Sequence, residues 1–163
     1  MKLIWLSISY FNYLFTSKSI NKAHSPFVYE FIKDVLKDKT QYKEFSGLHR
    51  YRKKICRSST IIDTVDFGSG AGKKDYISYH AKVGKLAKNR THSRKQLELL
   101  YKISKYFKPR VILEMGTAVG ISTLYLQKGH REAKIITMEG CAGLVHYAEK
   151  VFKTFKATDV DVV

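Results

Sequence analysis

The segment from Val111 to Gly140 constrains the fold more than any other part of the chain. It begins with the short apolar run Val111–Leu113, which is typical of a strand buried on both faces of a parallel sheet. Small residues follow at Gly116–Gly120, and they allow a sharp turn and a close approach of the backbone to a ligand. A helix is predicted from Gly120 to Lys128, and the glycine after it is a C-terminal stop.

A second strand, Lys134–Met138, is predicted after this helix, and it ends in Glu139. Strand, helix and strand form a βαβ unit with a right-handed crossover. The first strand also ends in an acid, Glu114. Glu139 lies 25 positions after Glu114, close to the roughly 20 residues that separate a glycine loop from the acid that binds ribose hydroxyls. The unit therefore predicts a nucleotide site at the carboxyl ends of two parallel strands.

The acid beside the loop indicates which ligand would suit this site. A dinucleotide fingerprint requires G-x-G-x-x-G, whereas the loop from Gly116 to Gly120 has only two glycines and follows a carboxylate. Glu114 would repel a pyrophosphate but would suit the ammonium and sulfonium groups of S-adenosylmethionine. The alternative is an α/β unit that binds nothing, since a fold does not guarantee a function. Glu114 argues against it, because an acid at the end of a buried strand is costly unless something uses it.

The segments Glu114–Ser122 and Ile136–Gly140 together resemble the class I S-adenosylmethionine-dependent methyltransferases. Within that family they look most like the O-methyltransferase branch that includes catechol O-methyltransferase. His24–Val28 and Asp66–Gly70 resemble a bacterial subgroup, so the likeness extends over nearly the whole chain. The resemblance implies a Rossmann-like, doubly wound parallel sheet preceded by a helical extension, and S-adenosyl-L-methionine as the cofactor.

The resemblance also implies residue roles. Glu114 and Gly116 would line the methionine end of the donor, Ser122 and loop amides would hold its carboxylate, and Glu139 would bind the ribose hydroxyls. The complete set of cofactor-binding candidates is Glu114, Gly116, Thr117, Gly120, Ser122, Glu139 and Gly140. The implied reaction is O-methyl transfer to a small-molecule acceptor, by in-line attack of the acceptor on the methyl group. No catalytic residue or metal ligand is assigned.

Two parts of the chain are predicted. Residues 1–92 form a mainly helical extension with a short strand at Thr60–Phe67 and a glycine-rich turn at Asp66–Gly72. Residues 93–163 form an incomplete S-adenosylmethionine-binding core. Because sheets of this family contain further strands, we expect the chain to be an inactive N-terminal fragment. We also expect the first core strand to have an unpaired apolar edge.

The first fifteen residues predict an amphipathic helix that is too short to span a bilayer. Its apolar face is formed by Ile4, Ile8, Phe11 and Phe15. We interpret this helix as packing on the protein or on a partner chain, so the N-terminal helices are candidates for a homodimer contact. Contact with a membrane surface is the alternative.

Capping residues and apolar periodicity predict the remaining elements. They are helices from Pro26 with Ser25 as N-cap, from Tyr42 to Ile55, from a capping box at Ser93 to Pro109 and from Ala142 to Phe155, a helix or loop from Ile77 to Lys88, and a strand from Asp159 to Val163.

The charge balance leaves other functions open. Thirty basic and 14 acidic residues give a net charge of +16, which favours contact with nucleic acids or anionic surfaces. The densest basic cluster consists of Arg50, Arg52, Lys53, Lys54 and Arg57, and a solvated surface is favoured over a nucleic-acid groove. A basic nucleic-acid-binding module and a non-catalytic interaction protein are the alternatives to a methyltransferase. Cys56 and Cys141 lie far apart, so neither a disulfide framework nor a zinc site is predicted, and a cytoplasmic location is expected.

Overall fold

The computed structural model describes residues 2–16, 24–66 and 76–163. Most of the glycine-rich turn predicted at Asp66–Gly72 therefore lies outside the described residues. The chain divides into two compact units, Met1–Lys39 and Thr40–Val163. The boundary expected between residues 92 and 93 stays a prediction. Within the described ranges, every helix is too short or too polar to cross a membrane.

The first unit contains helices only, within its described part. Helix α1 spans Lys2–Thr16, and α2 spans Pro26–Phe31 and continues into the π-helical turn η2, Ile32–Leu36. The Ser25 side chain accepts a hydrogen bond from the backbone N–H of Val28 at 3.4 Å, and Pro26 occupies the first turn. This arrangement confirms the predicted helix start, because serine satisfies a free N–H group there and proline needs no partner.

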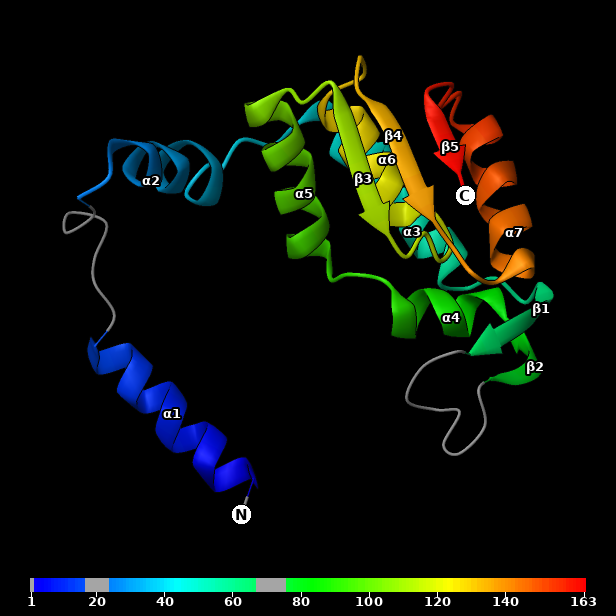
Figure 1. The fold of residues 1–163 in the computed structure, drawn as a ribbon, viewed down its shortest axis with the longest axis horizontal. Helices are drawn as coiled ribbons and strands as arrows, with labels where there is room; N and C mark the ends of the chain where they lie inside the picture. The colour runs from blue at the N-terminus through cyan, green and yellow to red at the C-terminus, as the bar shows by residue number, and fades with distance from the viewer. Residues whose placement is uncertain (1, 17–23, 67–75) are drawn as a thin grey trace. The chain divides into compact units, whose positions relative to one another are not determined.

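The second unit is built around a parallel sheet. Its strands are β3 (Val111–Met115), β4 (Lys134–Met138) and β5 (Val160–Val162), in the order β3-β4-β5 (Figure 1). Helix α6 (Ile121–Gly129) connects β3 to β4, and α7 (Ala142–Thr154) connects β4 to β5. The predicted βαβ unit is therefore confirmed, and the carboxyl ends of β3 and β4 lie side by side.

Helices α3 (Lys43–Ile55), α5 (Arg94–Phe107) and α6 lie on one side of the sheet (Figure 1). Ser93 and Gln96 form the predicted capping box at the start of α5. On α3, Phe45, Leu48 and Ile55 face the core and are buried. The core between these elements includes Phe45, Leu97, Tyr101, Leu124, Tyr125 and Leu144. Burial of these apolar side chains stabilises the unit and fixes α6 against the sheet.

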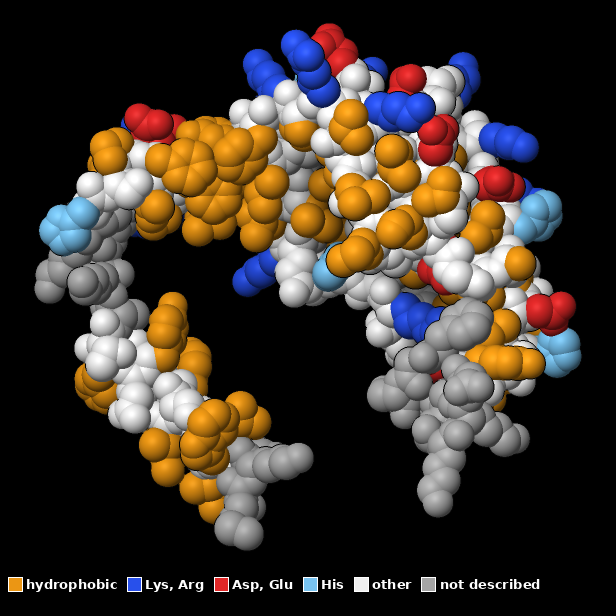
Figure 2. Space-filling view, viewed as in Figure 1, with side chains coloured by type: hydrophobic (Ala, Val, Ile, Leu, Met, Phe, Trp, Pro, Cys, Tyr) orange, Lys and Arg blue, Asp and Glu red, His pale blue; other side chains and the backbone are white. Residues whose placement is uncertain are grey.

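The opposite face of the sheet is apolar and exposed. Val111, Leu113 and Met115 point to it, and Met115 is 82% exposed. Figure 2 shows hydrophobic side chains gathered over the front of this sheet. The prediction that the first core strand is buried on both faces is wrong, because within the described residues helices cover only one side. The predicted unpaired edge is confirmed for the described residues, among which β3 pairs only with β4.

A separate hairpin precedes the sheet. Strand β1 (Ile61–Asp66) pairs antiparallel with β2 (Ile77–Lys82), and α4 (Val83–Arg90) follows. The β1 strand was expected, but the helix or loop predicted from Ile77 is wrong for the β2 residues. Strand β2 forms because β1 supplies the pairing groups, and local periodicity does not reveal that partner.

Candidate cofactor site

The loop between β3 and α6 has a backbone that requires glycine at two positions. Gly116 and Gly120 have φ angles of 96° and 75°, which side chains rarely tolerate. The N–H groups of Gly116 and Thr117 both donate to the carbonyl oxygen of Met138, at 2.9 and 3.0 Å. A Cβ atom on Gly116 would meet nothing within 4 Å. The loop is thus fixed to the end of β4, and the space over Gly116 is open to a ligand.

Glu139 joins this loop to the end of β4. Its Oε2 accepts a hydrogen bond from the N–H of Ala118 at 2.9 Å, and its Oε1 accepts one from the N–H of Cys141 at 3.0 Å. The carboxylate is half-buried, and each of its oxygens has a further lone pair for another donor. The predicted ribose-binding acid and the glycine loop are therefore in direct contact.

Glu114 points toward threonine hydroxyls on the helix-covered side of the sheet. Its Oε2 accepts hydrogen bonds from Thr123 on α6 and from Thr137 on β4, the latter at 2.7 Å. The hydroxyl oxygens of Thr137 and Thr117 are also 2.7 Å apart. Because an ionised carboxylate can only accept, Thr137 donates to Glu114 and Thr117 donates to Thr137. No hydrogen bond reaches Glu114 Oε1 from the residues that the structure describes.

This hydroxyl network changes the interpretation of Glu114 and Thr117, which were both predicted to bind the cofactor. Thr123 and Thr137 compensate part of the cost of placing Glu114 against the core, so a ligand is not needed to explain the acid. Thr117 is almost fully buried, and its side chain faces Thr137. Thr123 and Thr137 were not anticipated. The sequence signal for Thr137 is its register position, since it stands directly opposite Glu114 on the neighbouring strand.

The remaining predicted residues lie at the two strand-to-helix turns. Gly120 is the N-cap of α6, and Ser122 is half-buried in the first turn of that helix. The first N–H groups of a helix have no partner within the helix and favour an anion such as a carboxylate. Gly140 is exposed between Glu139 and Cys141. These positions suit the roles that the resemblance implies, and the roles stay predictions.

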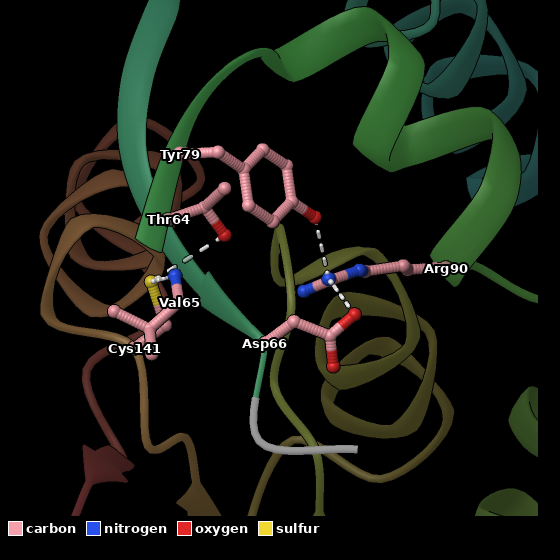
Figure 3. Close-up of polar contacts among 6 residues, drawn as sticks. All are labelled: Thr64, Val65, Asp66, Tyr79, Arg90 and Cys141. Carbon is pink, nitrogen blue, oxygen red and sulfur yellow. Dashed lines mark hydrogen bonds and ion pairs between the residues drawn. The ribbon is translucent and has the colours of Figure 1, made fainter. Parts of the chain in front are cut away.

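Cys141 anchors the β1–β2 hairpin beside Glu139 (Figure 3). Its buried Sγ accepts a hydrogen bond from the N–H of Val65 at 3.4 Å and lies 3.7 Å from the hydroxyl of Thr64. Burial raises the pKa of the thiol, but hydrogen bonds from the N–H groups of Leu144 and Val65 outweigh it and lower the pKa. The hairpin is thereby held at the start of α7.

Arg90, the last residue of α4, contacts the end of the hairpin at which β1 stops. The Arg90 guanidinium donates to the Tyr79 hydroxyl at 2.9 Å and lies 3.4 Å from the Asp66 carboxylate (Figure 3). Arg90 therefore bridges the carboxyl end of β1 and the side of β2. The bridge fixes the point from which the chain enters residues 67–75.

Two hollows away from the glycine loop are lined by basic residues. One cavity of about 780 Å³ lies between α3 and α7 and is lined by Arg50, Lys53, Lys54 and Arg57 together with hydroxyl groups. A second, of about 390 Å³, shares Lys53 and Arg57 with it. In the described ranges no group of three or more His, Cys, Asp or Glu side chains is placed to hold a metal ion. The surface over Gly116 is open, and Glu114 and Glu139 beside the glycine loop belong to the networks described above.

Comparisons with known proteins identify the fold. No protein-family model and no curated protein matches the sequence. The solved structure of the methyltransferase PaMTH1 from Podospora anserina, with SAH bound, matches with a TM-score of 0.51 and 16% identity, covering 91% of this chain and 51% of that one. The O-methyltransferase from Bacillus cereus in complex with SAH has a TM-score of 0.46 and 17% identity, covering 89% of this chain and 51% of its own.

The class of fold follows from the parallel βαβ core together with the match to PaMTH1. The chain has the Rossmann-like α/β fold of the class I methyltransferases. The sequence resemblance and the structural likeness agree on this class. The chain spans about half the length of the two solved proteins.

Proposed function

We propose that this chain supplies the donor-binding half of an S-adenosylmethionine-dependent methyltransferase. The observation that supports it most directly is the hydrogen bond from Ala118 to Glu139, because it joins the acid that follows β4 to the glycine loop that follows β3. That SAH is bound to PaMTH1, which shares the fold, supports the same ligand class. The acceptor is proposed to be a small molecule and the reaction an O-methyl transfer, on the sequence resemblance.

The residues around the glycine loop fit this donor. The open space over Gly116 admits a ligand close to the backbone, and the free N–H groups at the start of α6 suit its carboxylate. Glu139, held by two backbone N–H groups, accepts from ribose hydroxyls through its remaining lone pairs. When bound, the donor supplies an electrophilic methyl group. The chain binds and orients it, which lowers the entropic part of the barrier to attack by an acceptor.

Calorimetric titration of the 163-residue chain with S-adenosylhomocysteine tests this proposal. Saturable binding is expected, and Glu139→Gln is expected to weaken it about tenfold, or about 1.4 kcal/mol. Glu149→Gln is the matched control, because Glu149 is an exposed acid on α7. Equal affinities for the wild type and Glu139→Gln, or the absence of saturable binding, would overturn the proposal.

A second function, binding of a phosphate-bearing polymer such as RNA, is supported by the basic cavity between α3 and α7. Its four cationic side chains and several hydroxyls suit phosphate groups. Binding of a single-stranded RNA oligomer should then fall steeply as salt rises. Exchanging Lys53 and Lys54 for Gln should weaken it, whereas Glu139→Gln should leave it unchanged. If the affinity for RNA changes neither with salt concentration nor with the exchange of Lys53 and Lys54, this function is excluded.

A further inference from the structure

Helix α1 exposes an almost continuous apolar surface. Its aromatic side chains, Trp5, Tyr10, Phe11, Tyr13 and Phe15, are all exposed, and so are Ile4 and Ile8. Figure 2 shows these hydrophobic side chains along much of the helix. Ser7 interrupts them on one side, and on the other a polar stripe formed by Ser9, Asn12 and Thr16, along which Trp5 also lies. Monomeric proteins rarely expose an apolar surface of this kind without a partner for it.

The chemistry of α1 favours a lipid interface as that partner. Tryptophan and tyrosine prefer the boundary between lipid headgroups and acyl chains, because their rings are apolar at one end and polar at the other. A helix of 15 residues is about 22 Å long, shorter than the roughly 30 Å hydrocarbon layer. It therefore suits a position in the plane of the interface.

Charge identifies the kind of lipid and argues against a second copy of the chain. No acidic residue precedes Glu30, and Lys2, Lys18 and Lys22 lie within or close to the helix in the sequence. The whole chain carries a net charge of +16. Two such chains repel each other, whereas an anionic membrane surface attracts each of them.

We propose that α1 is a membrane-surface anchor that lies in the interface of an anionic lipid bilayer. The apolar stripe through Ile8 and Phe11 enters the acyl boundary, and the stripe through Ser9 and Asn12 stays in the headgroup layer. The proposal is independent of donor binding, because it concerns the other compact unit of the chain.

The single tryptophan of the chain makes a direct test available. Trp5 lies in α1, so its fluorescence reports the surroundings of this helix alone. Vesicles of equal parts phosphatidylcholine and phosphatidylglycerol are added to the full chain. A blue shift of the emission is expected, together with quenching by lipids brominated near the headgroup end of their acyl chains, because Trp5 lies along the stripe that stays at the headgroup boundary. Vesicles of pure phosphatidylcholine should produce a weaker response, and salt should weaken the response to the anionic vesicles.

Two double variants separate the stripes while keeping Trp5. Ile8→Gln with Phe11→Gln should lower the vesicle partition constant about tenfold or more, because apolar area is lost from the buried side. Ser9→Gln with Asn12→Gln places the same residue type on the polar stripe and should leave partitioning unchanged. Glutamine is a good helix former, so neither change disfavours the helix itself.

Three results would overturn the proposal. The first is no shift of the Trp5 emission with anionic vesicles. The second is equal loss of partitioning in both double variants. The third is a blue shift without vesicles that grows with protein concentration together with the mass of a dimer in light scattering. That last result would assign α1 to a homodimer contact.

Discussion

Replacing Thr137 with valine tests the hydroxyl network that holds Glu114. Thr137 is fully buried, and valine has nearly the same shape, so the change removes the hydroxyl without opening a cavity. It removes one donor to the Glu114 carboxylate and the acceptor used by the buried Thr117 hydroxyl. The variant thus isolates the contribution of polar contacts beneath the glycine loop.

The expected cost follows from these two losses. A hydrogen bond to a charged group contributes about 1.5 to 3 kcal/mol, and a buried hydroxyl left without a partner costs about 1 kcal/mol or more. The extra apolar surface of valine offsets about 1 kcal/mol of this. We expect the free energy of unfolding to fall by about 1.5 to 3 kcal/mol, which leaves the unit folded if its stability is in the usual range of about 5 to 15 kcal/mol.

Urea unfolding followed by far-ultraviolet circular dichroism provides the measurement, because Trp5 lies in α1 and does not report on the sheet. Thr154→Val is the control, since that threonine is exposed on α7 and its hydroxyl bonds only to Lys150 within the helix. A double-mutant cycle of Thr137→Val with Glu114→Gln should show a coupling of about 1 kcal/mol. If Thr137→Val costs no more than Thr154→Val, the network does not stabilise the fold.

Three further changes have definite expected results. Gly120→Ala should lower the unfolding free energy by about 1 to 3 kcal/mol in the same urea assay, because it puts a Cβ at a φ of 75° and 2.8 Å from the Phe152 ring; an unchanged midpoint would contradict this. Burial is the main cause that lowers the pKa of His49 in the folded state. The unfolded state therefore binds the proton more tightly, and the free energy of unfolding falls as the pH drops below 6.5, the pKa of the unfolded state. His49→Gln should flatten that dependence in acid titrations of the urea midpoint. Leu113→Lys, on the exposed edge strand, should slow aggregation measured by light scattering, and an equal rate would argue that other surfaces drive it.

Local sequence determined the helix ends and the βαβ core of this protein. Ser25 with Pro26, and Ser93 with Gln96, mark helix starts because their groups satisfy N–H donors only a few residues away. The glycine loop and Glu139 were predictable for a similar reason. Their spacing along one strand, helix and strand places them at the same edge of any parallel sheet.

Only the tertiary structure decided the surroundings of those residues. The hydroxyls that donate to Glu114 come from β4 and α6. Strand β2 pairs with β1, a separate segment that the local sequence of β2 does not reveal. The exposed face of β3 likewise depends on which elements pack against the sheet. An apolar run has the same local pattern whether one or both of its faces are covered. Burial and hydrogen bonding between distant segments therefore follow from packing, which short-range sequence patterns do not encode.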